Sequence, residues 1–229
     1  MRRAAAIRAL ALASVVVSGC TGLFHSNAGP EQIYYLRPSS VGAGADRGTP
    51  APVPPVSLRV THPLVAPGLD SPRIMLLQSD HRMNFYAGSR WPSAASDVIE
   101  SLAIQTLRAS GAWSSVEDTA SPFPSDYLLE TAVRRFEADY TGGGAAPVVY
   151  VAIDCLIGRG EGREVIATFT VSGSAQASAN RLSEVVAAFE QATATALESL
   201  AREAAQAARS DAQHADAGRS DAQHPGTAR

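Results

Sequence analysis

The chain has 229 residues, the length of one large domain or two small ones, and its 45% apolar and 18% charged residues indicate a globular protein. The formal net charge is −3, and all 19 basic residues are arginines that form no basic cluster, which excludes nucleic acid as a partner. Two cysteines, Cys20 and Cys155, exclude a disulfide framework and a four-cysteine zinc site, and no apolar run is long enough to span a bilayer.

Residues 1–19 have the pattern of a lipoprotein signal peptide. Three arginines lie among the first eight residues, and residues 9–17 form an apolar stretch of signal-peptide length. The sequence then continues Ser-Gly-Cys, ending at Cys20, which resembles the bacterial lipobox. We expect cleavage before Cys20 and lipid attachment to its thiol. The alternative is an ordinary signal peptide in which this cysteine is accidental.

Cleavage before Cys20 would leave 210 residues with 16 arginines against 22 acidic residues, a net charge of −6. Each buried acyl CH₂ contributes about 0.8 kcal/mol, so two or three chains such as palmitate are needed for a firm anchor. Thr21 follows the cysteine where an Asp would favour the inner membrane in enteric bacteria. By resemblance to that sorting rule, the outer membrane is the expected location.

The mature chain is expected to contain one domain, residues 31–208, behind a polar tether at residues 20–30. Residues 31–37 are rich in β-favouring side chains and predict a first strand. Residues 38–55 are rich in Pro, Gly and Ala without periodicity. They predict a flexible or extended loop, which we expect to add reach between anchor and body.

Short strands and a helix follow in the first half of the domain. Residues 57–60, 73–78 and 82–86 are β-like and are bounded by turn signals. Apolar residues at helical spacing between 99 and 107 predict a helix, and Gly111 is a suitable residue to end it.

The second half predicts three long strands. Residues 126–140, 149–157 and 165–171 alternate apolar and polar side chains, and Gly-rich turns join them, which predicts an antiparallel meander. The alternation changes parity past Arg134 and Arg135, which indicates a β-bulge.

Residues 182–208 predict an Ala-rich helix. Residues 209–229 contain Arg-Ser-Asp-Ala-Gln-His twice and predict a disordered low-complexity tail. Two amphipathic helices and an antiparallel sheet must cover each other's apolar faces. The predicted fold class is therefore α+β, an antiparallel sheet with two main helices packed on one face in a two-layer sandwich.

No motif for catalysis stands out. Metalloprotease, serine hydrolase, phosphate-loop and dithiol motifs are missing from the sequence. The glycines at 158–162 lead into a strand rather than a helix, which favours a hairpin turn over a phosphate site. Cys155 lies on the apolar face of its strand, whereas Asp154 faces the other way, toward solvent or a paired arginine. His62 is expected in a loop and His81 in an exposed turn. We predict no enzyme, no metal site and no cofactor.

Three aromatic residues, Phe85, Tyr86 and Trp91, lie close together in the sequence. They are candidates for an exposed patch that binds a partner or lipid. The alternative is that they pack the first helix onto the sheet.

The order of several features resembles the ABC-type transport auxiliary lipoproteins, over about residues 20–205. These features are the lipobox, Ile-Tyr-Tyr-Leu at 33–36, Phe-Tyr at 85–86, Arg-Trp at 90–91, Gly-Ala-Trp at 111–113, Asp-Tyr-Leu-Leu at 126–129 and the Ala-rich C-terminal helix. The family includes the outer-membrane lipoprotein of the paraquat-inducible (Pqi) system. The long loop at 38–55 and the repeated tail depart from the family pattern.

The resemblance implies a non-enzymatic role in lipid traffic across the periplasm of a Gram-negative bacterium. Expected partners are a protein with mammalian-cell-entry (MCE) domains that bridges the envelope, and the associated ABC permease and ATPase. The lipoprotein would dock the far end of this conduit at the outer membrane, and a homo-oligomer is compatible with that role. Two alternatives remain open: a module that itself binds lipid or solute, and a structural envelope lipoprotein.

Overall fold

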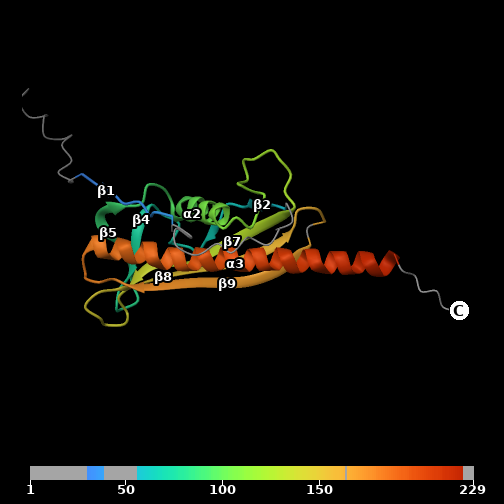
Figure 1. Cartoon of the computed structure of the whole chain (residues 1–229). Coiled ribbons are helices and arrows are strands. Elements are labelled where there is room, and N and C mark those ends of the chain that lie inside the picture. The colour runs from blue at the N-terminus through green and yellow to red at the C-terminus, as the bar shows by residue number, and fades with distance from the viewer. Residues whose placement is uncertain (1–29, 39–55, 163, 224–229) are drawn as a thin grey trace, which may run out of the picture. The chain divides into compact units, whose positions relative to one another are not determined.

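The computed structural model describes residues 30–38, 56–162 and 164–223 (Figure 1). The predicted signal peptide, Cys20 and most of the predicted loop at 38–55 lie outside the described residues. The described residues from Gln32 to Gln223 belong to one compact unit, and the fold below is that of this unit. In the part of the chain that the structure describes, no helix combines the length and hydrophobicity needed to cross a bilayer.

The described residues form one sheet of nine strands and two helices, which confirms the predicted α+β class. The elements in chain order are β1 (Gln32–Ile33), β2 (Ser57–Val60), β3 (Leu64–Val65), β4 (Arg73–Leu77), β5 (Met83–Arg90), α2 (Ala95–Ala109), β6 (Ser115–Glu117), β7 (Tyr127–Asp139), β8 (Val148–Arg159), β9 (Val165–Gln176) and α3 (Leu182–Gln223). The short strands β3 and β6 were not predicted, and the first strand is shorter than the expected 31–37.

The sheet is mixed rather than antiparallel. The meander β7–β8–β9 is antiparallel, as predicted. The other edge of β7 pairs in parallel with β2, β3 and β4, and the pairs β1–β5 and β2–β6 are also parallel. Parallel neighbours require long crossover connections. The expectation of an antiparallel sheet was therefore wrong for these five pairs, because long connections give no local signal of strand direction, whereas β4 and β5 do form an antiparallel pair.

The β-bulge predicted near Arg134 is confirmed in β7. The register of β7 against β8 shifts between Val133 and Arg135. Val133 is buried before the shift and Phe136 after it, so the apolar side of the strand stays turned toward the core. The extra residue leaves the guanidinium groups of Arg134 and Arg135 both bound to carboxylates, those of Asp154 and Glu137 respectively.

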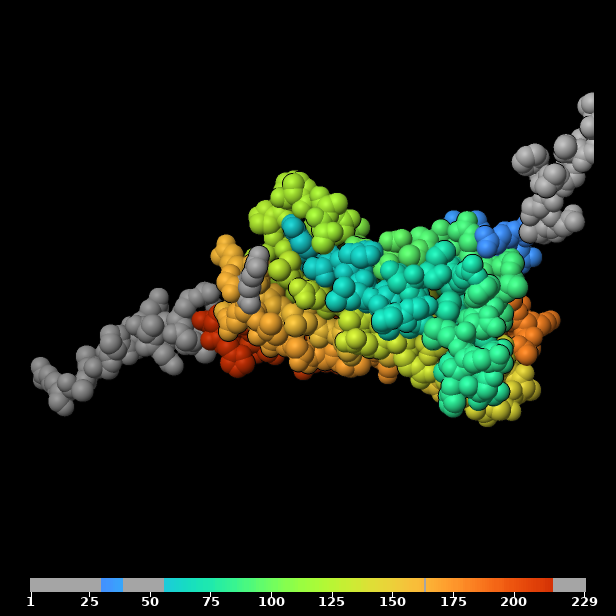
Figure 2. Space-filling model, turned by 180° about the vertical axis from the view of Figure 1, so that it is seen from behind, coloured from blue at the N-terminus to red at the C-terminus, as the bar shows by residue number. Residues whose placement is uncertain are grey.

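Both helices cover the same face of the sheet, as predicted (Figure 1). Between the two layers lies an aromatic cluster of Trp91, Phe136 and Phe189. Its ring centroids are separated by 5.8 Å for Trp91–Phe136, 5.2 Å for Trp91–Phe189 and 5.1 Å for Phe136–Phe189. Seen from behind, the residues of the first half of the domain, coloured cyan and green, lie against the yellow and orange residues of the second half (Figure 2).

The C-terminal helix is longer than predicted. It continues to Gln223, whereas the sequence was expected to leave the helix after residue 208 and to become disordered. The Ala-rich sequence propagates the helix, and Asp211 binds it to the sheet. Its carboxylate accepts hydrogen bonds from the Tyr127 hydroxyl at 2.9 Å and from the Arg159 guanidinium at 2.7 and 3.0 Å. The prediction of disorder was therefore wrong up to Gln223, and residues 224–229 lie outside the described part.

Candidate binding surface

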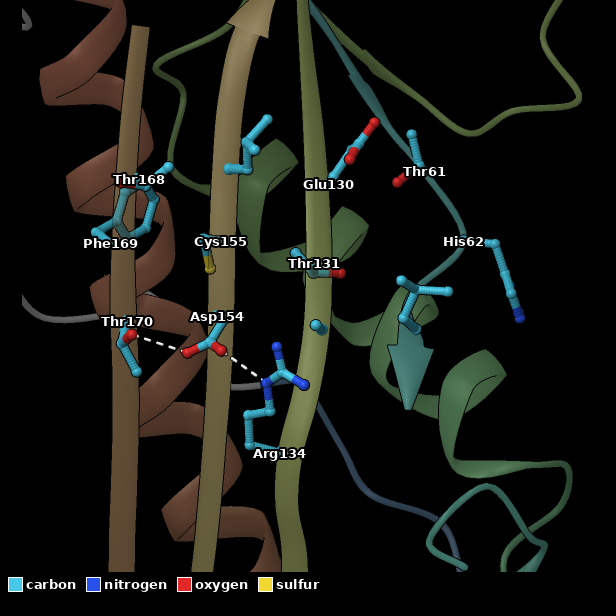
Figure 3. A pocket seen from close by; sticks show the side chains of 13 residues that line it. Thr61, His62, Glu130, Thr131, Arg134, Asp154, Cys155, Thr168, Phe169 and Thr170 are labelled. Atoms are coloured by element: carbon cyan, nitrogen blue, oxygen red, sulfur yellow. Dashed lines mark hydrogen bonds and ion pairs between the residues drawn. The ribbon is translucent and has the colours of Figure 1, made fainter. Parts of the chain in front are cut away.

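An open hollow of about 710 Å³ lies on the face of the sheet opposite the helices (Figure 3). Its volume falls in the range of small-molecule sites, but such sites are normally enclosed. The wall comes from β7, β8 and β9 and from the connection between β2 and β3. The lining residues are Thr61, His62, Leu64, Glu130, Thr131, Ala132, Arg134, Asp154, Cys155, Leu156, Thr168, Phe169 and Thr170.

The polar part of this hollow is an ion pair supported by a hydroxyl. The Asp154 carboxylate accepts hydrogen bonds from Arg134 Nε at 2.6 Å and from the Thr170 hydroxyl at 2.8 Å (Figure 3). The hydrogen bond from Arg134 in particular, with that from Thr170, holds the pKa of Asp154 below its usual value. Of the two alternatives predicted for Asp154, pairing with an arginine is confirmed. A carboxylate engaged in this way is poorly suited to act as a general base.

The thiol of Cys155 is equally unsuited to catalysis. Its side chain is buried, as predicted from the alternation of its strand. Burial, and secondarily the charge of Asp154, raises the pKa of Cys155 to about 12. Because the thiolate is the reactive form, a thiol that stays protonated at neutral pH is inert.

One cluster in the described residues has the side chains of a metal site. His62 Nδ1 lies 2.7 Å from Glu100 Oε2, and the donor atoms of His62, Asp97 and Glu100 lie within 4.8 Å of one another. The His62 side chain is 52% exposed and already bonded to Glu100, which is the geometry of an ordinary surface pair. This contact could not be predicted from the sequence, because His62 and Glu100 are 38 residues apart and only the fold brings them together.

The three candidate aromatic residues do not share one surface. Trp91 is fully buried in the aromatic cluster, so its prediction as a partner-binding residue was wrong, and the packing alternative holds for it. The hydroxyl of Tyr86 lies 2.8 Å from that of Tyr140, and burial raises the pKa of Tyr86. Phe85 is 39% exposed beside Met83, with the Arg73 guanidinium 3.9 Å from its ring centroid. Of the three residues, Phe85 is the one best able to contact a partner.

The alternative role as a lipid carrier needs an apolar cavity between helices and sheet. That space is occupied by the aromatic cluster and by aliphatic side chains such as Ile99, Leu197 and Leu200, all of which are almost completely buried. The hollow on the opposite face is open and carries a charged pair. The packing therefore favours a binding surface over an internal cargo site.

The sequence profile of the family described as "ABC-type transport auxiliary lipoprotein component" matches residues 34–203. The chain belongs to this family. The match begins just after β1 and ends within α3, and therefore includes β2 to β9, the helix α2 and the first half of α3. By family, the protein is an auxiliary transport lipoprotein and not a member of a known enzyme family.

Two solved structures are similar to this auxiliary lipoprotein. Protein XCC0632 from Xanthomonas campestris, assigned to the family DUF330, is 26% identical; the match covers 80% of this chain and 99% of that chain at a TM-score of 0.71. A second, uncharacterized protein is 16% identical, with coverage of 76% and 99% and a TM-score of 0.58, and shares the fold. No curated protein matches the chain.

Proposed function

We propose that this lipoprotein is the non-enzymatic, membrane-anchored subunit of an ABC/MCE-type lipid transport system. It is acylated on Cys20, faces the periplasm from the outer membrane and docks the periplasm-spanning conduit there. The observation that carries this proposal is the family match over residues 34–203, preceded in the same chain by the lipobox at Cys20.

The structure limits how far the domain can lie from the lipid anchor. Gln32 pairs with Ser89 in β5, and the backbone N–H of Tyr34 donates to the carbonyl of Arg90 at 2.9 Å. The chain is thus fixed to the body before the 38–55 loop begins, so that loop cannot add reach, contrary to expectation. The tether is limited to about 12 residues, or ~40 Å at full extension.

Acylation and location can be tested with the two cysteines as a matched pair. We expect metabolic labelling with palmitate and intact mass to show acylation in the wild type and in Cys155→Ser, and none in Cys20→Ser. The acylated protein should fractionate with the outer membrane. Label retained in Cys20→Ser would contradict the anchor, and recovery with the inner membrane would contradict the location.

The partner can be tested by affinity purification of the full-length protein from mildly solubilised envelopes. We expect recovery of an MCE-domain protein or of the permease. Recovery of neither, from envelopes that contain both, would refute the proposed transport role. An unaltered membrane barrier and lipid composition in a deletion strain would favour the alternative of a structural lipoprotein.

A further inference from the structure

The sheet ends in one long strand whose outer edge is open. The strand β9 has 12 residues and pairs only with β8 on its inner side. Among the described residues, no turn, loop or side-chain hydrogen bond reaches the outer N–H or C=O groups of β9. About half of the backbone groups of an edge strand point outward, ready to pair with another chain.

This edge has little of the usual protection: its one irregularity is a register shift against β8, between Val165 and Ala167 near the start of the strand. Its sequence, Val-Ile-Ala-Thr-Phe-Thr-Val-Ser-Gly-Ser-Ala-Gln, contains no charged residue and no proline. Natural edge strands are normally kept short or carry lysines, prolines or bulges, because an open edge invites pairing. At the other margins of the described sheet the outermost strands are short, since β1 has two residues and β6 has three, and β1 covers only the last two residues of β5. With 12 residues, β9 is the longest open edge in the described sheet, which favours it as the place where a partner strand would add.

A groove runs beside the open edge and would hold the side chains of an added strand. It has a volume of about 570 Å³ and is lined by five consecutive residues of β9, 165–169, facing α3. The other lining residues are Arg159, Glu164, Glu203, Gln206, Ala207, Ser210, Asp211 and His214. Five consecutive lining residues mean that the backbone of the strand itself borders the groove.

We propose that an extended segment of a partner protein, bearing basic side chains, adds to β9 as a further strand of the sheet. The proposal rests on the docking role and names the surface that performs it. Pairing of this kind takes its affinity from main-chain hydrogen bonds and its specificity from alternate side chains.

The charge of the groove selects a basic strand over a second copy of this chain. Its described lining carries three carboxylates, on Glu164, Glu203 and Asp211, against one guanidinium, on Arg159. Arg202 lies 3.9 Å from Glu203 but lines the separate groove between α2 and α3. A two-fold pairing of β9 with its own copy would bring the two acidic grooves together and would be opposed by their repulsion.

A synthetic peptide tests the edge directly. The probe is a fluorescent ten-residue peptide of alternating valine or threonine and arginine, titrated into the full-length protein in detergent. We expect saturable binding, and slower hydrogen exchange of β9 amides on addition of the peptide. The same peptide with glutamate for arginine, or with alternate backbone amides N-methylated, should bind at least tenfold more weakly. Equal binding of all three peptides, or protection confined to another element, would overturn the proposal.

Two charge reversals on α3 provide a matched pair. Glu203→Lys lies in the groove beside β9, whereas Glu198→Lys lies on the same helix but lines the groove next to α2. The first should weaken binding of the basic peptide by roughly two- to tenfold, the second not at all, with unchanged thermal stability in both. Equal effects of the two reversals would contradict β9 as the docking edge.

The transport role and the docking edge at β9 can be refuted independently of each other. If the wild type recovers an MCE-domain protein or permease and Glu203→Lys recovers the same amount, with no peptide protecting β9, the edge proposal is wrong and the transport role stands. If the wild type recovers neither while the peptide still protects β9, the edge binds a partner of another system, and the transport role is wrong.

Discussion

The two halves of this domain are built by different rules. In the C-terminal half, β7, β8 and β9 have 13, 12 and 12 residues, and each pairs with the next strand in the chain. In the N-terminal half, the longest strand has eight residues, and β2, β3 and β4 reach over long sequence distances to successive stretches of β7. The strand β7 thus joins a local meander to a set of non-local parallel pairs.

This difference means that the N-terminal half, more than the C-terminal half, depends on contacts between residues far apart in the sequence. A local meander forms with little loss of chain entropy, whereas each parallel pair must close a long loop first. The N-terminal strands are short and therefore rely on the common core for their stability. The predictions below probe this dependence, beginning with the side chain that links both halves.

Trp91→Ala should give the largest loss in the free energy of unfolding. Trp91 follows β5 directly, is fully buried, and packs on Phe136 of β7 and Phe189 of α3. Removing a buried tryptophan costs about 3–5 kcal/mol through lost burial and the cavity left behind. Urea unfolding followed by circular dichroism measures the change. Phe85→Ala, at an exposed position of β5, should stay within about 0.5 kcal/mol. A Trp91→Ala variant as stable as wild type would show that the halves do not share a core.

Gly173→Ala tests the contact between β9 and α3. A Cβ atom at Gly173 would collide with the backbone carbonyl oxygen of Ala192, so the helix lies against the strand only because glycine is there. We expect a loss of about 1–3 kcal/mol in the free energy of unfolding, because the backbone must shift to relieve the overlap. Gly142→Ala, in the open turn after β7, meets no atom within 4 Å and is the matched control. Equal effects at the two positions would contradict this account of the interface.

Asp211→Asn tests why α3 continues beyond the predicted end. The carboxylate accepts hydrogen bonds from Arg159 and Tyr127, and the hydrogen bond from Arg159 in particular lowers its pKa. Hydrogen bonds to charged groups contribute about 1.5–3 kcal/mol, and since Arg159 is partly exposed we expect a loss of about 1–2 kcal/mol at pH 7. Faster amide exchange after residue 208 should accompany it.

The stabilisation that Asp211 provides should depend on pH in a definite direction. A carboxylate whose pKa is lower in the folded protein stabilises it above the unfolded pKa, and this stabilisation is lost as the pH falls through the folded value. The wild type should therefore lose its advantage over Asp211→Asn when the pH is lowered below about 4. A constant difference from pH 7 to pH 3 would mean that the charge of Asp211 is not what holds the helix.

The sequence predicted the C-terminal half well because its signals are local. Alternation, Gly-rich turns and the parity change at Arg134 fix the meander, its register shift and the face that buries Cys155. The same reasoning failed for β3, β6 and the parallel pairs, since two- and three-residue strands have no periodicity and their partners are far away in the chain. Trp91 was ambiguous for a similar reason: an aromatic residue at a strand end suits both a core and a surface patch until its neighbours are known.

The end of α3 and the candidate sites show the same limit. The repeat from residue 209 has the composition of a tail, and the hydrogen bonds from Arg159 and Tyr127 to Asp211, which hold this part of the helix on the sheet, could not be read from the sequence. The pair His62–Glu100 and the open edge of β9 depend on spatial neighbours as well. Cys20 is the reverse case, because its expected role rests on a linear motif that needs no fold.

The smallest effect is expected for Asp154→Asn on the open face of the meander. Asp154 on β8 joins Arg134 on β7 and Thr170 on β9, so it crosses all three strands. The side chains of Asp154 and Arg134 are 41% and 59% exposed, and such pairs contribute about 0.2–1 kcal/mol. We expect Asp154→Asn to lower the free energy of unfolding by an amount within this range, and this difference should vanish in 1 M salt. Thr170→Val removes a hydrogen bond whose donor is neutral and leaves the ion pair intact, so its effect should depend much less on salt. A loss well above this range would mean that the pair, rather than the backbone ladder, holds the three strands in register.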